Sequence, residues 1–209
     1  MSSVSALAQQ LAVVVGFENP RVSLEQYRTP PDLAARLVHD ADLGGDIENR
    51  LVVDLGTGTG MLALGAALRG PAGVVGIDLD RDPLRVAQSN ERRVGTTTDI
   101  SWVRADATDA PLRPSDDLPI TVVMNPPFGA QNSNEHADRA FLATAARVSD
   151  VSYSVHNAGS EEFVESFAAD NTGEVTRKFR AELDLPHQFD FHEDDSRTLD
   201  AEIFRIEWQ

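Results

Sequence analysis

Cysteine is absent from this 209-residue sequence, and lysine is nearly absent. The lack of thiols excludes disulfides, cysteine nucleophiles and thiolate metal sites within the chain. Lys178 is the only lysine among 18 basic residues. The sequence also lacks a signal-peptide pattern and an apolar run of about 18 residues, so we expect a cytoplasmic protein with no membrane contact.

Basic residues are scarce relative to acidic ones. The chain has 34 Asp and Glu residues and a formal net charge of −16. A surface rich in aspartate and poor in lysine is typical of a halophilic protein kept dissolved by molar salt, although general acidity for solubility gives the same composition. At about 1 M salt the Debye length falls to about 3 Å. The negative charge therefore does not exclude RNA as a partner.

The length suits one α/β domain over residues 1–209. Strand-like apolar runs alternate with amphipathic stretches, which predicts a mostly parallel sheet with helices on both faces. The predicted strands are 51–55, 73–77, 100–103, 120–124, 151–156, 175–185 and 199–208, the last two as an antiparallel pair. The predicted helices are 4–15, 32–43, 61–68, 83–94, 135–148 and 161–169. Residues 1–30 are expected to supply the first helix and a loop beside the cofactor and substrate.

A glycine-rich turn follows the first strand, with glycines at 56, 58 and 60. Such a turn lets a ligand approach the backbone where the next helix begins. The spacing is not the Gly-x-Gly-x-x-Gly fingerprint of dinucleotide sites, and Asp54 places a carboxylate where a pyrophosphate would lie. A cationic amino acid group suits that carboxylate, which indicates S-adenosylmethionine as the ligand.

Acidic residues also follow the second and third strands. Asp78 is about twenty residues past the glycines, where a carboxylate can accept both ribose hydroxyls of an adenosine. Asp106 can accept the amino group of adenine, and Asp80 is read as the cap of the helix at 83–94. Each carboxylate taken alone is equally consistent with a solvated loop charge.

Two prolines at 30 and 31 precede the helix at 32–43, and they place Thr29 as its capping residue. The start of that helix also presents free amides, so Thr29 and Gln26 are alternatively ligand-lining residues. At the end of the fifth strand, His156 and Asn157 are read as a plain polar strand end, with a pair on the substrate side as the alternative.

The motif Asn125-Pro126-Pro127-Phe128 follows a strand with the composition of a buried one. The Asn125 side-chain oxygen and the Pro126 carbonyl can accept the two N–H groups of an exocyclic adenine amine, which turns the nitrogen lone pair toward an electrophilic methyl. Phe128 can stack on the base, a contact worth about 1–3 kcal/mol. The alternative is a simple turn after a strand.

These motifs, together with Gln26-Tyr27-Arg28-Thr29, resemble in order and spacing the methyltransferase-like protein five family, including its archaeal members. The resemblance covers nearly all of the chain beyond residue 20. It implies a Rossmann-like class I methyltransferase that makes N6-methyladenosine in small-subunit ribosomal RNA with S-adenosylmethionine as donor. The cofactor-binding residues it implies, together with the acidic candidates above, are Gln26, Tyr27, Thr29, Asp54, Gly56, Gly58, Thr59, Met61, Asp78, Leu79, Asp106, Ala107 and Asn125. The catalytic residues are Asn125, Pro126, Pro127 and Phe128.

The resemblance also implies a small zinc-binding activator subunit as partner. The strand at 100–103 is expected at one edge of the sheet, where Ile100, Trp102 and Val103 could receive an added strand. Packing of Trp102 under a neighbouring helix is the alternative. The basic residues Arg177, Lys178, Arg180, Arg197 and Arg205 form either an RNA-facing patch or partners for Asp194 and Asp195.

Three other functions share parts of this pattern. Methyltransferases of the release-factor glutamine amide usually carry Tyr after the prolines and an extra N-terminal helical domain. DNA adenine methyltransferases usually add a target-recognition domain, for which this length has no room. A non-catalytic ribosome-assembly module would not need Asn125, Asp54 and Gly56 intact.

Overall fold

A computed structural model describes residues 3–21, 24–114, 117–127, 137–185 and 197–209, with only the backbone described at 182–185 and 197–199. Its strands are β1 (Leu51–Leu55), β2 (Gly73–Asp78), β3 (Ile100–Arg104), β4 (Ile120–Met124), β5 (Val151–Asn157), β6 (Gly173–Leu185) and β7 (Arg197–Trp208). Its helices are α1 (Val4–Leu11), α2 (Pro31–Leu43), α3 (Met61–Ala67), α4 (Arg81–Val94), α5 (Ala137–Val148) and α6 (Glu161–Asp170), with a short 3-10 helix, η2 (Ala107–Asp109).

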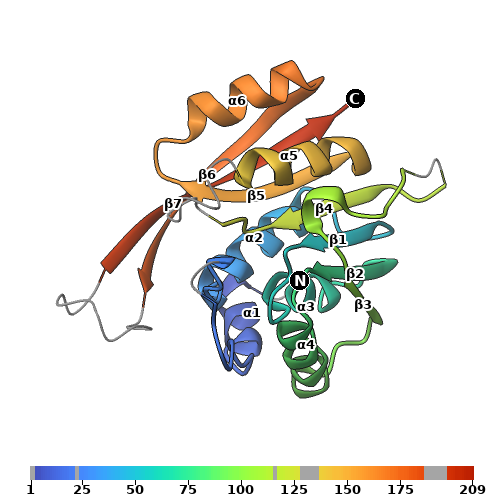
Figure 1. Cartoon of the computed structure of the whole chain (residues 1–209), viewed down its shortest axis with the longest axis vertical. Helices are drawn as coiled ribbons and strands as arrows, with labels where there is room; N and C mark the ends of the chain where they lie inside the picture. Colours follow the sequence, from blue (N-terminus) through green and yellow to red (C-terminus); the bar gives the residue numbers. More distant parts are fainter. Residues whose placement is uncertain (1–2, 22–23, 115–116, 128–136, 186–196) are drawn as a thin grey trace.

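All seven strands join one sheet in the order β3-β2-β1-β4-β5-β7-β6 (Figure 1). The first five are parallel, and β7 is antiparallel to both β5 and β6. The order reverses between β1 and β4, because the chain leaves β1 toward β2 and β3 and returns on the other side. In open α/β sheets ligands bind outside the carboxyl ends of the strands at such a reversal. The predicted mixed sheet and its antiparallel end are confirmed.

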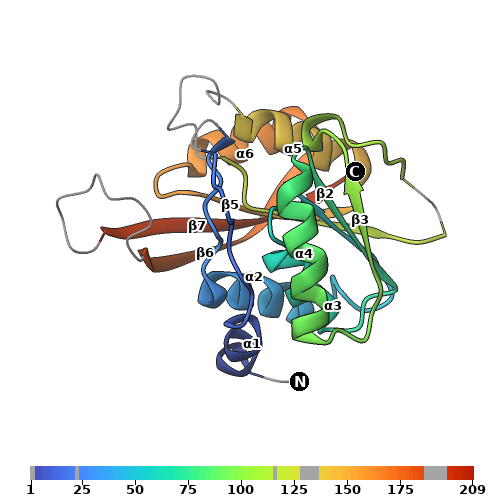
Figure 2. The same ribbon diagram turned by 60° about the horizontal axis from the view of Figure 1, so that its bottom comes forward.

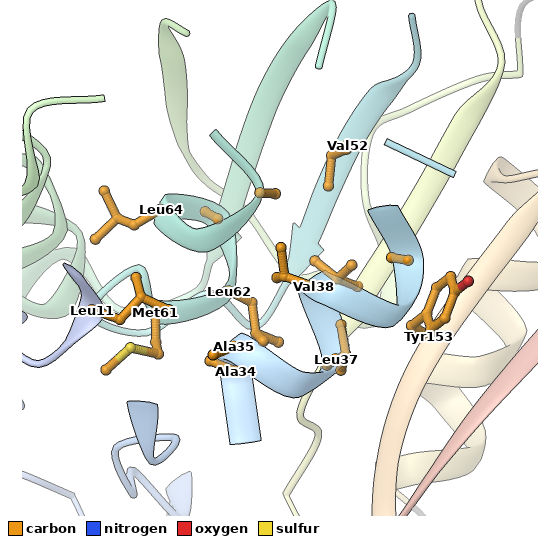
Figure 3. Packing of buried hydrophobic residues seen from close by; sticks show 14 of the residues in the cluster. Leu11, Ala34, Ala35, Leu37, Val38, Val52, Met61, Leu62, Leu64 and Tyr153 are labelled. Carbon is orange, nitrogen blue, oxygen red and sulfur yellow. The ribbon is translucent and has the colours of Figure 1, made fainter. Parts of the chain in front are cut away.

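The helices cover both faces of the sheet, as predicted. In Figures 1 and 2, α1 to α4 lie on one side of it and α5 and α6 lie on the other. Side chains of α1, α2 and α3 pack with the strands in one apolar cluster (Figure 3), which includes Leu11, Leu37, Val52 and Leu64. A second cluster under α5 and α6 contains Phe141, Leu142, Val164 and Phe167 among others. The sheet is therefore packed on both faces by apolar layers, which fixes the position of the strand end from which the glycine turn begins.

Helix starts and ends depart from the predictions at two places that matter for the site. Helix α1 ends at Leu11, so residues 12–15 do not continue it. Helix α2 begins at Pro31 with Pro30 as its N-cap and no side-chain capping bond, so the prediction that Thr29 caps this helix is wrong. Proline fixes φ near the helical value and lacks an N–H, and the first turn of a helix needs no N–H donor there. The Thr29 hydroxyl is therefore not used at the start of α2.

The hairpin of β6 and β7 runs past the other strands (Figures 1 and 2). Strand β5 pairs with β7 up to the Asn157 and Ala201 pair, and β6 continues beside β7 to the Leu185 and Arg197 pair. The extension thus leaves the sheet at the carboxyl end of β5. This is the same edge at which β1, β2 and β4 end.

Candidate active site

A cavity of about 460 Å³ opens at the carboxyl ends of β1, β2 and β4. The predicted site residues that line it are Gln26, Tyr27, Thr29, Gly56, Gly58, Thr59, Met61, Asp78, Leu79, Asp106, Ala107, Asn125 and Pro127. Asp54 and Pro126 are not among the lining residues, and Phe128 lies outside the described residues. The structure therefore brings the two halves of the predicted site, the cofactor side and the Asn-Pro-Pro side, to one cavity.

The glycine turn forms the floor of this cavity. Gly56, Gly58 and Gly60 have φ values of 70°, 53° and 92°, which residues with a Cβ adopt at a cost. A Cβ on Gly58 would also lie 2.9 Å from the ring of Phe17. The turn needs glycine because its backbone has positive φ values and because Phe17 of the N-terminal segment packs closely against Gly58.

Asp54 supports the turn from below. Its Oδ2 accepts hydrogen bonds from Thr57 Oγ1 at 2.6 Å and from the Ala63 amide at 2.9 Å. The side chain is buried, and burial raises its pKa to about 7 against the lowering effect of those two hydrogen bonds. The nearby Asp78 carboxyl raises the pKa further. Because Asp54 does not line the cavity, the prediction that it faces the cofactor changes: its carboxyl group joins the turn to the start of α3.

Asp78 ends β2 and does reach the cavity. Its two oxygens accept hydrogen bonds from the Gly58 and Asp80 amides, both at 2.8 Å. Burial raises its pKa, and these backbone donors act in the opposite direction. A carboxylate accepts further bonds beyond these two, so Asp78 keeps capacity for a ligand hydroxyl. Asp106 also lines the cavity, and its Oδ1 accepts from the amide and hydroxyl of Thr108.

The predicted capping role of Asp80 is confirmed, since its Oδ1 accepts from the Asp82 amide at the start of α4. Its other oxygen accepts from Gln26 Nε2 at 3.1 Å, and Gln26 Oε1 accepts from the Arg21 amide at 2.8 Å. Both ends of the Gln26 amide are thus engaged by protein. Gln26 lines the cavity and ties the N-terminal segment to α4.

Asn90 makes a second tie between the same elements. It is fully buried on α4 and exchanges two hydrogen bonds with the backbone of Val15, each 2.9 Å long. Its Nδ2 also donates to the Thr59 carbonyl of the glycine turn at 3.0 Å. Asn90 therefore joins the N-terminal segment, the turn and α4 at one point.

Asn125 carries an unused hydrogen-bond acceptor. Its Nδ2 donates to Thr29 Oγ1 at 3.0 Å. Within the described part of the chain, its Oδ1 is buried and has no hydrogen-bond partner. A buried polar atom without a partner costs about 1–3 kcal/mol, so a ligand that donates to this oxygen gains that amount back. An unpaired acceptor therefore belongs to a residue that lines the cavity.

Several lining residues were missed by the sequence reasoning. They are Phe17, Leu24, Glu25, Arg28, Thr57, Thr108, Ala137, Ala140 and Phe141. Phe17 and Arg28 belong to the segment between α1 and α2, whose irregular sequence carries no periodic signal. Ala137 and Ala140 lie on α5, where small residues look like ordinary helix positions. The available signal was proximity to predicted motifs: Leu24, Glu25 and Arg28 lie beside or within residues 26–29, Thr57 lies within the glycine turn, and Thr108 follows Ala107.

Other predicted features lie away from the cavity. His156 is buried against Phe163 and Phe204, and burial lowers its pKa to about 4. It is a core residue, so neither the polar strand end nor the substrate-side pair describes it. Trp102 is partly buried and its Nε1 donates to Glu91 Oε2 of α4 at 2.8 Å, so its ring follows the packing alternative.

The basic residues near the C-terminus are largely paired. Lys178 contacts Glu161 and Glu202, and Arg180 also contacts Glu202. Arg205 pairs with Asp46 and Glu207. The partners proposed from the sequence, Asp194 and Asp195, lie outside the described residues. Lys178, Arg180 and Arg205 are therefore engaged by carboxylates that the sequence did not indicate.

The described residues contain no group of three or more His, Asp or Glu side chains arranged to hold a metal ion. None of the helices described has the length and apolar character needed to cross a bilayer.

Known proteins share this fold. A crystal structure from Pyrococcus horikoshii, described as that of a candidate RNA methyltransferase, is 36% identical and matches with a TM-score of 0.87, covering 100% of this chain and 98% of that one. Residues 52–150 match the family model described as a methyltransferase domain. The fold and the cavity at its switch point are those of a Rossmann-like methyltransferase.

The family follows from two relatives in animals. METTL5 of Danio rerio, named an rRNA N(6)-adenosine-methyltransferase, is 34% identical over 94% of this chain and 94% of its own length. Mettl5 of Drosophila melanogaster has the same name and is 33% identical over 96% of this chain and 94% of its own length. This chain belongs to the METTL5 family. The resemblance noted from its motifs is confirmed.

Proposed function

We propose that this protein transfers a methyl group from S-adenosylmethionine to the N6 amine of an adenosine in small-subunit ribosomal RNA. The observation that carries the proposal is the buried, unpartnered Oδ1 of Asn125 at the wall of the cavity. Membership of a family whose animal relatives are named rRNA N(6)-adenosine-methyltransferases supports the substrate class.

The cavity residues fit S-adenosylmethionine. A carboxylate at the end of β2, Asp78, suits ribose hydroxyls, and Leu79 beside it is 55% exposed, which gives an aromatic base an apolar surface. Asp106 and Ala107 suit the edge of that base, and the glycine turn with Thr59 and Met61 suits the amino acid part. When bound, this cofactor supplies an electrophilic methyl group on a sulfonium sulfur.

Asn125 acts on the acceptor amine. Its Oδ1 accepts one N–H of the adenine amine, and the Pro126 carbonyl is proposed to accept the other. Two such bonds draw the nitrogen away from conjugation with the ring and turn its lone pair outward. The lone pair would form the new N–C bond as the S–C bond to the methyl breaks, with S-adenosylhomocysteine as the leaving group. The amine would then lose its extra proton to water, so no base has to remove a proton beforehand. Phe128 is proposed to stack on the ring, as the sequence motif suggests.

The DNA and glutamine alternatives differ in their acceptor. A glutamine amide also offers N–H groups to Asn125, so the acceptor oxygen alone does not separate these reactions. The animal relatives are named rRNA N(6)-adenosine-methyltransferases, which favours RNA as the acceptor. The hairpin extension of β6 and β7, at the same sheet edge as the cavity, gives RNA a surface to contact beside the site.

We also propose the small zinc-binding activator subunit as a partner. Strand β3 is at the edge of the sheet and pairs only with β2 among the described strands. An edge strand offers unpaired backbone groups to an added strand. Because Trp102 packs against α4, the backbone of Ile100 to Val103 would carry this contact rather than the indole ring.

The proposal is tested by incubating the protein with methyl-labelled S-adenosylmethionine in molar KCl, with the small zinc-binding subunit present. The acceptors are small-subunit ribosomal RNA, a release factor and double-stranded DNA, offered separately. We expect label in the RNA, recovered as N6-methyladenosine after digestion to nucleosides. Label in the release factor or in DNA selects the corresponding alternative. Cofactor binding without label in any acceptor favours the non-catalytic assembly module.

A further inference from the structure

The amide of Asn125 is held by a residue from a distant part of the chain. Its Nδ2 donates to Thr29 Oγ1 at 3.0 Å, across 96 residues of sequence. Both residues line the cavity. The donor end of the amide is thus satisfied by protein, while its acceptor end, Oδ1, has no partner in the described part of the chain.

Helix capping does not explain the position of the Thr29 hydroxyl. Helix α2 starts after Pro30 without a side-chain cap, so the Thr29 hydroxyl is not used at the helix terminus. The two prolines that follow fix the backbone φ angles at 30 and 31. They place Thr29 at a defined position beside the end of β4, where the hydroxyl meets the Asn125 amide.

The hydrogen bond to Nδ2 also fixes the direction of Oδ1, because both atoms belong to the same planar amide. Rotation about the last side-chain bond of asparagine is soft, because this torsion joins an sp³ carbon to an sp² carbon. The hydrogen bond to Thr29 restricts that rotation, so the plane and direction of Oδ1 are fixed before a ligand arrives. Catalysis depends on such alignment, because the accepted N–H determines where the nitrogen lone pair points.

We propose that Thr29 is the positioning residue for Asn125: its hydroxyl orients the amide so that Oδ1 accepts the substrate amine. The inference rests on the proposed function, because it deepens the role given there to Asn125. It changes the expected role of Thr29, which the sequence placed among the capping or cofactor-binding residues.

The kinetic test uses Thr29→Val, which has nearly the same shape and no hydroxyl, and Thr29→Ser, which restores the hydroxyl. We expect Thr29→Val to lower kcat about tenfold, the effect of losing one neutral hydrogen bond. Its calorimetric affinity for S-adenosylmethionine should stay at the wild-type level, and Thr29→Ser should recover most of kcat. If Thr29→Val keeps kcat and binds the cofactor more weakly, Thr29 is a cofactor ligand and the positioning role is wrong.

Thr121 provides a matched control. It lies near the start of β4, the strand that Asn125 directly follows. Thr121 is buried on β4, and its hydroxyl accepts from Arg50 Nε at 2.8 Å. Thr121→Val therefore removes a hydrogen bond to a threonine hydroxyl at a residue that does not line the cavity, and it should lower stability without lowering kcat. The double variant Thr29→Val with Asn125→Ala should be no slower than Asn125→Ala alone. Additive losses would contradict action through Asn125.

A binding measurement decides the inference without turnover. The protein is saturated with S-adenosylhomocysteine and titrated with two RNA oligonucleotides, which carry at the target position either adenosine or purine riboside, the analogue without the amine. Wild type should bind the adenosine oligonucleotide more tightly, and Thr29→Val and Asn125→Ala should both lose this preference. A wild type without preference, or a preference retained by Thr29→Val, overturns the inference. Failure of the label-transfer experiment with this preference intact would instead overturn the proposed function alone.

Discussion

Asn125 and Asp54 show how two polar residues at neighbouring strand ends take different roles. Asn125 has an unpaired acceptor and lines the cavity, whereas the Asp54 carboxyl group accepts hydrogen bonds from Thr57 of the glycine turn and from Ala63 of α3. The difference follows from depth: Asp54 lies within β1 and points under the turn, while Asn125 comes one residue after β4 ends.

Asn125→Ala should lower turnover at least about a hundredfold, by analogy with the loss of one preorganised hydrogen bond in an oxyanion hole. Its affinity for S-adenosylmethionine, measured by calorimetry, should change little, because the missing bond is made to the amine. Asn157→Ala is the control, since Asn157 is an exposed asparagine at the end of the neighbouring strand β5. Wild-type turnover in Asn125→Ala would remove this residue from the chemistry.

Asp54→Asn should alter how stability depends on pH. The pKa of Asp54 is about 7 in the folded chain and 3.8 as an ordinary side chain, so the folded state keeps a proton that the unfolded chain releases in this window. The stability that Asp54 contributes is therefore present at low pH and lost as the pH rises toward 7. Asparagine keeps an acceptor for Thr57 and Ala63 and does not titrate.

The free energy of unfolding of Asp54→Asn relative to wild type should thus rise by on the order of 1 kcal/mol per pH unit between about pH 4 and 7. Denaturant titrations at a series of pH values measure this difference. The difference is needed because His156, whose pKa is lowered to about 4, makes wild-type stability rise with pH over much of the same range. A constant difference would mean that Asp54 is not protonated in the folded protein.

Motif residues were predictable at this scale because their chemistry shows in the sequence, as with Asn125 directly after β4 and Asp78 at the end of β2. The roles of Thr29 and Asp54 were not predictable. Thr29 sits before a helix, where capping is the common use of threonine, and only the fold brings it to Asn125. Asp54 is next to the glycine turn in sequence, but its direction depends on the pleat of β1.

At the level of elements, the segment between α1 and α2 acts as a wall of the site. It contributes Phe17 over the glycine turn and Gln26, Tyr27 and Thr29 to the lining. Asn90 ties this wall to the turn, so the cavity depends on contacts between parts of the chain that are far apart in sequence.

Asn90→Ala should therefore loosen both the fold and the site. The substitution removes three hydrogen bonds from buried or partly buried backbone groups, and we expect a loss of at least about 2 kcal/mol in unfolding free energy. We also expect weaker binding of S-adenosylmethionine. Asn171→Ala is the control, because Asn171 Nδ2 donates to the Phe167 carbonyl at the end of α6, away from the cavity. If Asn90→Ala binds the cofactor as tightly as wild type, the wall does not depend on the hydrogen bonds of Asn90.

The core elements were predicted with nearly their observed bounds, while the connecting segment was not. Strands β1 and β4 are five-residue runs rich in β-branched valine, isoleucine and threonine, and a short length with this composition favours a buried strand over a helix. Residues 12–15 continue the apolar composition of α1, which led to a helix prediction that is too long. Their backbone instead turns toward Asn90 and Arg28, contacts that no local pattern reveals.

At the scale of the whole molecule, the net charge of −16 must be accommodated on a chain of 209 residues. Several scarce cations are held by carboxylates, such as Arg205 by Asp46 and Lys178 by Glu161. The remaining excess of acidic groups repels itself at low ionic strength. The halophilic character expected from the composition remains a prediction.

Thermal stability should therefore increase with salt. We expect the melting temperature to rise by at least about 5 °C between 0.1 M and 2 M KCl, which corresponds to a gain of about 1–2 kcal/mol for a chain of this size. Circular dichroism melts measure the change, and sucrose at matched osmolality is the control for exclusion from the surface. Equal melting temperatures at both salt concentrations would mean that the acidity reflects solubility alone.

The most direct test of the account is a map of N6-methyladenosine in ribosomal RNA from cells that lack this protein. We predict that one methylated adenosine of the small-subunit RNA disappears, that the wild-type gene restores it, and that the gene for Asn125→Ala does not. An unchanged map, or restoration by Asn125→Ala, would contradict the account.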